Sequence, residues 1–320
     1  MNRRKFTKSL AMLSAMGVTG NFLSGCKGKS EKLDFSVSTT GSKVKIHTNA
    51  VEKMSKVMFL ADSHISYFDG LVEPYSDYAK RMYKAFAKMP KIEILDATFK
   101  KAEKENFDLI LLGGDIINFP SDYNVKRLKE SMEASKVPVK YIAGNHDWHF
   151  EGSGIDIAQT QVRKNWMKKL EPLFFGEDYD CYKVILNGVK FLMVDDSAHD
   201  ISQKQLDWAK RELSDGMPAI FAMHIPLYVE GRYYDCGNAK WGFDTDRGYR
   251  IERRQRHPVR QTPQTFEFRD LVFNSPNVLG VLAGHTHRLA YDYLNGKFQA
   301  VCDRFIDKGE YITLEICPKA

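Results

Sequence analysis

Five short polar clusters in the sequence each follow a run of apolar residues, and their side chains are of types that bind metal ions. The clusters are Asp62-Ser63-His64, Gly113-Gly114-Asp115, Gly144-Asn145-His146-Asp147, the single His224, and Gly284-His285-Thr286-His287. Histidine, aspartate and asparagine without a thiolate suit ions such as iron, manganese and zinc. An asparagine amide offers an oxygen without adding charge. The pattern therefore predicts a metal site, in which a carboxylate such as Asp115 can bridge two cations.

Two of the clusters contain candidate ligands two residues apart. Asp62 and His64, and likewise His285 and His287, point to the same side if the chain is extended there. Each motif alone is weak evidence, because Gly-Asn-His is usually a turn and a single histidine after a strand is usually structural. The occurrence of all five motifs, in order and each after an apolar run, favours one common site.

The apolar runs that precede the clusters predict the elements that must position them. Buried strands are predicted at residues 56–61, 107–112, 137–143, 189–194, 219–223 and 279–283. Helices are predicted at residues 94–106, 124–134 and 202–213, the last with Ser202 as its N-cap. Edge, hairpin or antiparallel strands are expected at residues 33–50, 178–188, 298–303 and 311–317. Apolar strands separated by helices indicate a layered α/β fold, in which ligands bind beyond the carboxyl ends of the strands.

The first 25 residues have the composition of an export signal. Residues 10–23 are apolar but interrupted, and they are shorter than the roughly 20 apolar residues that span a bilayer. Asn2-Arg3-Arg4-Lys5-Phe6-Thr7-Lys8 resembles a twin-arginine signal. Leu23-Ser24-Gly25-Cys26 resembles a bacterial lipobox in which Cys26 is lipidated. We therefore expect a protein of the bacterial cell envelope, periplasmic or anchored to a membrane through Cys26, with residues 26–50 as a tether and edge strand.

The composition is that of a globular protein and gives little support for nucleic-acid binding. The chain has 320 residues, of which 43% are hydrophobic and 28% charged, which excludes a disordered, collagen-like or disulfide-dominated protein. The net charge is +6, but four basic residues of the acid-free first 25 supply +4, which leaves +2 for the rest. No Cys-x-x-Cys pair is present, so a zinc ribbon is not supported.

Taken together, the five clusters resemble the calcineurin-like metallophosphoesterase superfamily, from about residue 56 to the C-terminus. The resemblance implies a single four-layer α/β/β/α sandwich domain over residues 51–320. It also implies two metal ions (manganese, iron or zinc) held by seven side chains: Asp62, His64 and His287 on one ion, Asn145, His224 and His285 on the other, and Asp115 between them. In the same resemblance His146 acts on the substrate without binding metal.

One position departs from the protein serine/threonine phosphatase branch of that superfamily. There an aspartate three residues after the bridging aspartate orients the catalytic histidine, whereas this chain has Asn118. The chain is more similar to the small phosphodiesterases, the group that includes class III cyclic-nucleotide and glycerophosphodiester phosphodiesterases.

Residues 229–262 are expected to form a lid over the site, because they begin five residues after His224. They contain eight basic and five acidic residues interleaved with aromatic rings. Arginine and aromatic side chains can bind an anion and stack on a base or sugar, although a solvated charged loop has the same composition. The candidate substrate contacts are Asn118, His149, Arg232 and Tyr234.

The expected function is hydrolysis of a small organic phosphate ester, with a phosphodiester preferred. A metal-bridging hydroxide would attack phosphorus while His146 assists the leaving group. The alternatives are a phosphomonoesterase or nuclease of the same superfamily, and a non-catalytic metal-binding lipoprotein. A nuclease needs a broad basic groove, which a charge of +2 does not indicate, so nucleic acid is not an expected partner. A binding protein has no need of every metal-type residue and of His146.

Overall fold

The computed structural model describes residues 32–67, 77, 80, 81, 83, 84, 92–148, 160–229, 262–305 and 309–319. The described residues from Leu33 onward belong to one compact unit. Several expected features lie outside them: the export signal, Cys26, His149, and residues 230–261 of the expected lid with Arg232 and Tyr234. The domain boundaries expected from the sequence therefore stay predictions.

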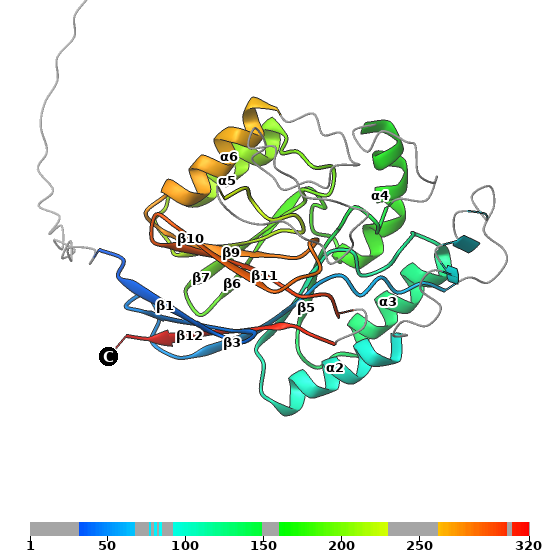
Figure 1. Cartoon of the computed structure of the whole chain (residues 1–320), viewed down its shortest axis with the longest axis horizontal. Helices are drawn as coiled ribbons and strands as arrows, with labels where there is room; N and C mark the ends of the chain where they lie inside the picture. Colours follow the sequence, from blue (N-terminus) through cyan, green and yellow to red (C-terminus); the bar gives the residue numbers. More distant parts are fainter. Residues whose placement is uncertain are drawn as a thin grey trace, which may run out of the picture. The chain divides into compact units, whose positions relative to one another are not determined.

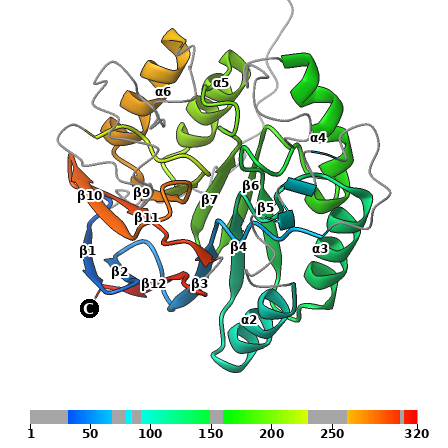
Figure 2. The ribbon, with the colours of Figure 1, turned by 45° about the vertical axis from the view of Figure 1, so that its right-hand side comes forward.

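Two mixed sheets of six strands each lie face to face (Figures 1 and 2). The first sheet has the order β1 (Phe35–Thr40), β2 (Lys43–Thr48), β12 (Ile312–Pro318), β3 (Ser55–Leu60), β4 (Leu109–Gly113) and β5 (Val139–Ile142). The second has the order β10 (Ala290–Leu294), β11 (Lys297–Val301), β9 (Val278–Ala283), β8 (Ala219–Ala222), β7 (Val189–Val194) and β6 (Cys181–Leu186). Strands β3, β4 and β5 are parallel, and so are β7, β8 and β9.

Helices cover the outer faces of both sheets, which gives the four layers expected from the sequence. The helices are α2 (Ile92–Lys104), α3 (Asp122–Ala134), α4 (Thr160–Phe174), α5 (Gln203–Leu213) and α6 (Pro263–Asn274). Helices α2, α3 and α4 lie on the side of the first sheet, and α5 and α6 on the side of the second (Figures 1 and 2). Among the described residues, no helix has the length and apolarity that crossing a membrane requires.

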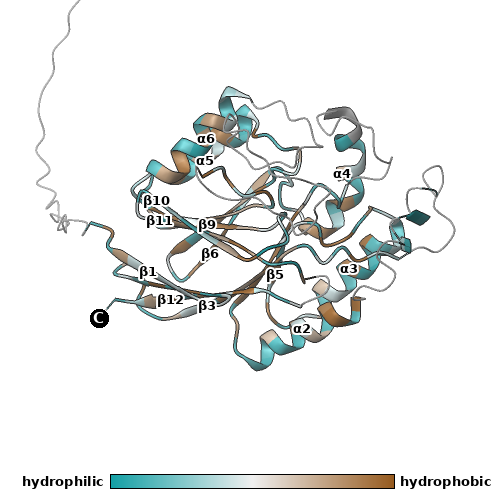
Figure 3. Ribbon diagram, in the orientation of Figure 1, coloured by the Kyte–Doolittle hydropathy of each residue, from teal (hydrophilic) through white to brown (hydrophobic). Residues whose placement is uncertain are grey.

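The amphipathic pattern of the helices and the apolar runs of the strands explain these layers. Helix α2 buries Leu95, Thr98, Phe99 and Ala102, which share one face because a helix turns every 3.6 residues. Every residue of β4, β7, β8 and β9 is buried. These strands are apolar except for Lys190 of β7, which pairs with Asp215, because each sheet packs against the other sheet on one face and against helices on the other. Figure 3 shows this apolar interior in brown.

Most elements agree with the sequence prediction, and the differences have physical causes. Helix α5 begins after Ser202, which forms a capping box with Gln205. The expectation of antiparallel strands at residues 298–303 and 311–317 is only partly right. Strand β11 is antiparallel to β10 but parallel to β9, and β12 is antiparallel to β3 but parallel to β2. The sequence pattern does not predict β10, because none of its residues is buried and it has no apolar run.

Candidate metal centre

The five polar clusters follow β3, β4, β5, β8 and β9, and the loops that carry them are bonded to one another. Asp62 donates its backbone N–H to the carbonyl of Gly114 at 3.0 Å, which joins the loops after β3 and β4. The N–H of His285, in the second sheet, donates to Oδ2 of Asp62, in the first, at 2.8 Å. The carboxyl ends of both sheets therefore meet at one edge, as the sequence predicts.

One group of side chains is formed by Asp62, His64 and His287, whose potential ligand atoms all lie within 4.8 Å of one another. Nε2 of His64 is 3.0 Å from Nε2 of His287, which in turn is 3.1 Å from Oδ1 of Asp62. Zinc–nitrogen bonds of about 2.0–2.1 Å put two ligands of one ion roughly 3 Å apart. The spacing of these three side chains therefore fits a single ion.

A second group is formed by Asp115, His224 and His285. Nε2 of His224 lies 3.2 Å from Oδ2 of Asp115 and 3.3 Å from Nδ1 of His285. The same Oδ2 is 3.7 Å from Nε2 of His64, so Asp115 lies between the two groups. The Oδ1 atom of Asn145 is buried and accepts no hydrogen bond from the described residues. A buried acceptor without a donor is costly, and a bound cation would satisfy it.

Hydrogen bonds behind the centre orient two of the histidine rings. Nδ1 of His224 donates to the carbonyl of Gly113 at 2.9 Å, and Nδ1 of His64 donates to Oδ1 of Asn118 at 3.0 Å. Both rings therefore turn Nε2 toward the centre, which is the usual arrangement of metal-binding histidines.

Asn118, a candidate substrate contact in the sequence, lies behind His64 in this structure, and its contact with substrate stays a prediction. Its side chain is fully buried, and both ends of its amide are used inside the protein. Oδ1 accepts from His64, and Nδ2 donates to Oγ of Ser66 at 2.9 Å. Asn118 therefore orients His64 from behind.

The backbone at the strand ends is left-handed and not extended, which corrects the geometry expected for the residue pairs. The φ angles are +59° at Asp62, +44° at His64, +51° at Asp115, +69° at His285 and +57° at His287. Residues other than glycine rarely have positive φ, although aspartate and histidine have it more often than most. The chain curls at each strand end and so brings both members of a pair onto one point. Strain of this kind concentrates at functional sites.

Burial and charge give the two carboxylates the protonation state that metal binding requires. Burial alone would raise the pKa of Asp62 and Asp115. Nearby His287 nevertheless lowers the pKa of Asp62 below its usual value, and His224 lowers that of Asp115 well below it. Burial would lower the pKa of His224, yet Asp115 and Asp62 raise it to about 10. Burial lowers the pKa of His64 to about 4. Of these four side chains, only His224 would have to lose a proton at neutral pH when a cation binds.

His146 lies at the edge of this centre. Its backbone N–H donates to Oδ1 of Asp115 at 2.7 Å, and its ring packs perpendicular to that of His64 with 4.7 Å between centroids. The side chain is half-buried, whereas the other histidines of the centre, apart from His287, are fully buried. His146 is therefore accessible to a molecule bound at the centre.

Three further side chains support the centre, and their roles were not expected from the sequence. Asp147 accepts from the N–H groups of Ile117 and Gly144, at 2.8 and 2.7 Å, and joins two of the loops. Asp196 accepts from the N–H of His224 at 3.1 Å. Burial raises the pKa of both carboxyls to about 7. His199 is buried with φ of +61°, and its ring lies perpendicular to that of His285 at 5.5 Å. Asp196 follows the apolar run of β7, which is the signal that could have identified it.

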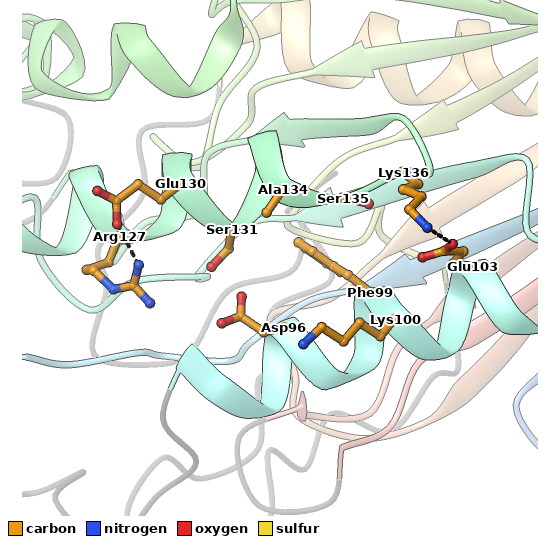
Figure 4. Close-up of a pocket in the computed structure, with 10 residues that line it drawn as sticks. All are labelled: Asp96, Phe99, Lys100, Glu103, Arg127, Glu130, Ser131, Ala134, Ser135 and Lys136. Atoms are coloured by element: carbon orange, nitrogen blue, oxygen red, sulfur yellow. Dashed lines mark hydrogen bonds and ion pairs between the residues drawn. The ribbon is translucent and has the colours of Figure 1, made fainter.

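A cavity of about 290 Å³ between α2 and α3 is separate from the centre (Figure 4). Two of its basic side chains are paired: Lys136 with Glu103 and Arg127 with Glu130, each at 2.5 Å. Its lining contains no histidine and none of the polar clusters after the strands.

Comparisons with known proteins agree with this geometry. The profile of the family described as calcineurin-like phosphoesterase matches residues 55–289. A Fibrobacter succinogenes protein described as a probable cyclic nucleotide phosphodiesterase is 24% identical over 186 residues, which are 58% of this chain and 62% of that protein. This chain thus spans less than two thirds of that relative. A dimetal phosphatase from Danio rerio has a similar fold, with a TM-score of 0.50 and 13% identity over 82% of this chain and 92% of that one.

Proposed function

Because the chain belongs to the calcineurin-like phosphoesterase family, we propose that it hydrolyses a small organic phosphodiester at the centre described above. The observation that carries this proposal is the convergence of three overlapping three-residue groups of potential ligands, of which two contain Asp115 and one of those two also contains His146. The relative described as a probable cyclic nucleotide phosphodiesterase supports a diester over a monoester.

Seven side chains of this chain are proposed to hold two metal ions. One ion is assigned to Asp62, His64 and His287, the other to Asn145, His224 and His285, and Asp115 to both. The donor set of imidazole nitrogens and carboxylate oxygens suits manganese, iron or zinc. When bound, such a pair supplies positive charge to the phosphoryl oxygens and lowers the pKa of water. The remaining task of the protein is to hold the ester and to move a proton to its leaving alcohol.

His146 is proposed to donate that proton. Its backbone is fixed by Asp115 and its ring by contact with His64, so that the imidazole is held beside the centre with little freedom. A positioned general acid contributes about 10²–10⁴-fold to rate. His149, Arg232 and Tyr234 stay candidates for substrate contact on the sequence alone.

We also propose that the protein is exported and anchored in the bacterial cell envelope. The support is the order of basic, apolar and Leu-Ser-Gly-Cys segments over residues 1–26. The partners of the protein are then a membrane, through lipid on Cys26, and a small phosphate ester.

The experiment that tests the proposed activity uses full-length mature protein loaded separately with manganese, iron or zinc. A panel of phosphodiesters, the matching monoesters and single-stranded DNA is followed by ³¹P NMR or product chromatography. We expect turnover of small diesters above that of monoesters, and none of DNA. Preferential turnover of monoesters or DNA would support the alternative enzymes, and no turnover with any metal would support a binding protein.

A further inference from the structure

Two tyrosines stack on one another beside the metal centre, and the centre does not use them. The rings of Tyr67 and Tyr123 have centroids 4.1 Å apart and planes inclined by 22°. Tyr67 lies three residues after His64, and Tyr123 lies in the first turn of α3. Three residues of chain span at most about 11 Å between Cα atoms, so Tyr67 is close to the ion site that contains His64.

Tyr67 is exposed even though its partner covers one face of its ring. Its exposed fraction is 47%, whereas Tyr123 is half-buried. A stack on the surface buries little area, and a tyrosine that only packs against α3 does not need to present half of its surface to solvent. The exposed face of Tyr67 is a planar apolar surface of the kind that takes another ring.

The segment from His64 to Tyr67 is bonded along its length to the segment that leads into α3. Ile65 pairs with Ile117 as an isolated bridge. Asn118 binds both His64 and Ser66 through its side-chain amide. The N–H of Tyr67 donates to Oδ1 of Asn124 at 3.0 Å.

These contacts fix the position of the stack relative to the metal centre. Asn118 links the stack to the centre, because its Oδ1 accepts from His64 and its Nδ2 donates to Ser66, the residue before Tyr67. Asn124 is itself held, since its N–H donates to Oγ of Ser121 and its Nδ2 to the carbonyl of Phe119. A pre-positioned aromatic surface loses little conformational entropy when it binds a ligand.

We propose that Tyr67, supported by Tyr123, stacks on a planar aromatic group of the phosphate ester whose phosphate binds at the centre. This inference rests on the proposed function and adds a substrate class to it: esters in which one alcohol carries an aryl ring or a heterocyclic base. Tyr67 acts in specificity, because it contacts the organic part of the ester and none of the reacting atoms.

The test compares two diesters of which only one contains a planar base. They are the ethyl ester of a nucleoside 5′-phosphate and the ethyl ester of glycerol 3-phosphate, and both are esters of primary alcohols. Binding of each to the manganese-loaded protein is measured by calorimetry with non-cleavable phosphonate analogues, and turnover is measured separately by ³¹P NMR. The variants are Tyr67→Leu, which keeps apolar volume without a ring, and Tyr67→Phe, which keeps the ring.

We expect Tyr67→Leu to weaken binding of the base-containing analogue roughly tenfold, as expected for the loss of one aromatic stack, and to leave the ring-free analogue unchanged. Tyr67→Phe should bind both as the wild type does. Tyr293→Leu is the matched control, because Tyr293 is an exposed tyrosine (53%) on β10, six residues beyond His287. If Tyr67→Leu lowers the melting temperature sharply, the binding of the two analogues is compared in Tyr123→Leu instead.

Equal loss of affinity for both analogues, or no loss for either, would overturn the stacking role. Failure of the proposed function has a different signature, which is absence of turnover of both diesters by the wild type. The binding comparison remains decisive for Tyr67 in that case, since it does not depend on turnover.

Discussion

The Nδ1 atom of His64 lies 3.0 Å from Oδ1 of Asn118, on the side of the ring that faces away from the metal centre. Because an amide oxygen only accepts, Nδ1 must carry the proton and Nε2 is left as an acceptor that points at His287. The tautomer of His64 is thus set by a buried residue that lies behind its ring.

This relationship predicts that Asn118 controls metal affinity. Asn118→Leu removes the acceptor, and we expect metal affinity to fall about 10–100-fold, as is typical when the partner of a ligand histidine is lost. Asn118→Asp keeps an acceptor at the same place and should retain most of the affinity. Ser66→Ala, which removes only the other contact of the Asn118 amide, is the control. Competition with a metal-binding dye measures all three, and equal affinities in Asn118→Leu and the wild type would contradict the assignment.

Gly144 is predicted to tolerate no side chain. A Cβ atom there would lie 2.2 Å from the backbone nitrogen of Asp115 and 2.3 Å from its Oδ1. Gly144→Ala must therefore displace Asp115, and we expect loss of bound metal together with destabilisation of about 1–3 kcal/mol. Metal analysis and thermal melting are the measurements.

Gly296→Ala is the control for that variant. Its φ is +76°, but a Cβ there meets no atom within 4 Å. Gly296→Ala should lower the free energy of unfolding by about 1 kcal/mol through backbone strain alone and leave the metal content unchanged. Full metal content in Gly144→Ala would show that the two loops are not packed as described.

The metal-free protein is predicted to lose stability as the pH rises above neutrality. The pKa of His224 is raised to about 10, so its ion pair with Asp115 contributes fully below the unfolded value of about 6.5 and is lost as the pH approaches 10. The slope is at most about 1.4 kcal/mol per pH unit. Denaturant melts of chelator-treated protein between pH 6 and 10 measure it. His224→Gln lacks the titrating group and should show a flatter profile, and the same slope in both proteins would disprove this origin.

Much of this fold and centre can be predicted from the sequence, because the signals are local. The strands after which the clusters fall are continuous apolar runs, and the clusters contain residue types that bind metals. What cannot be predicted depends on tertiary contacts. The pairing of β11 and β12 with parallel neighbours is set by distant strands, and the left-handed turns at Asp62 and His285 are imposed by the packing of the loops. His199 contacts His285, which lies 86 residues later in the sequence, and no local pattern around His199 predicts that contact.

The export proposal makes a prediction about the leader. In a bacterial host, replacing Arg3 and Arg4 by lysine should retain the precursor in the cytoplasm, because a twin-arginine translocase reads that pair. The control is the double variant Lys5→Arg and Lys8→Arg, which keeps both the positive charge of the segment and the Arg3-Arg4 pair. Cys26→Ser should release the exported protein from the membrane fraction. Immunoblots of cell fractions give the result, and normal export of the double-lysine variant would indicate the general secretion route.

The central claim is that seven side chains form one binuclear centre, and counting metal ions in three proteins tests it most directly. Circular dichroism first shows that all three proteins, the wild type, Asp115→Asn and His146→Ala, are folded. Elemental analysis should then give two ions per chain for the wild type and for His146→Ala. Asp115→Asn should hold clearly fewer. His146→Ala should also lose most of its turnover. A wild type that takes up no metal ion, or an Asp115→Asn variant that holds as much metal as the wild type, would contradict the account.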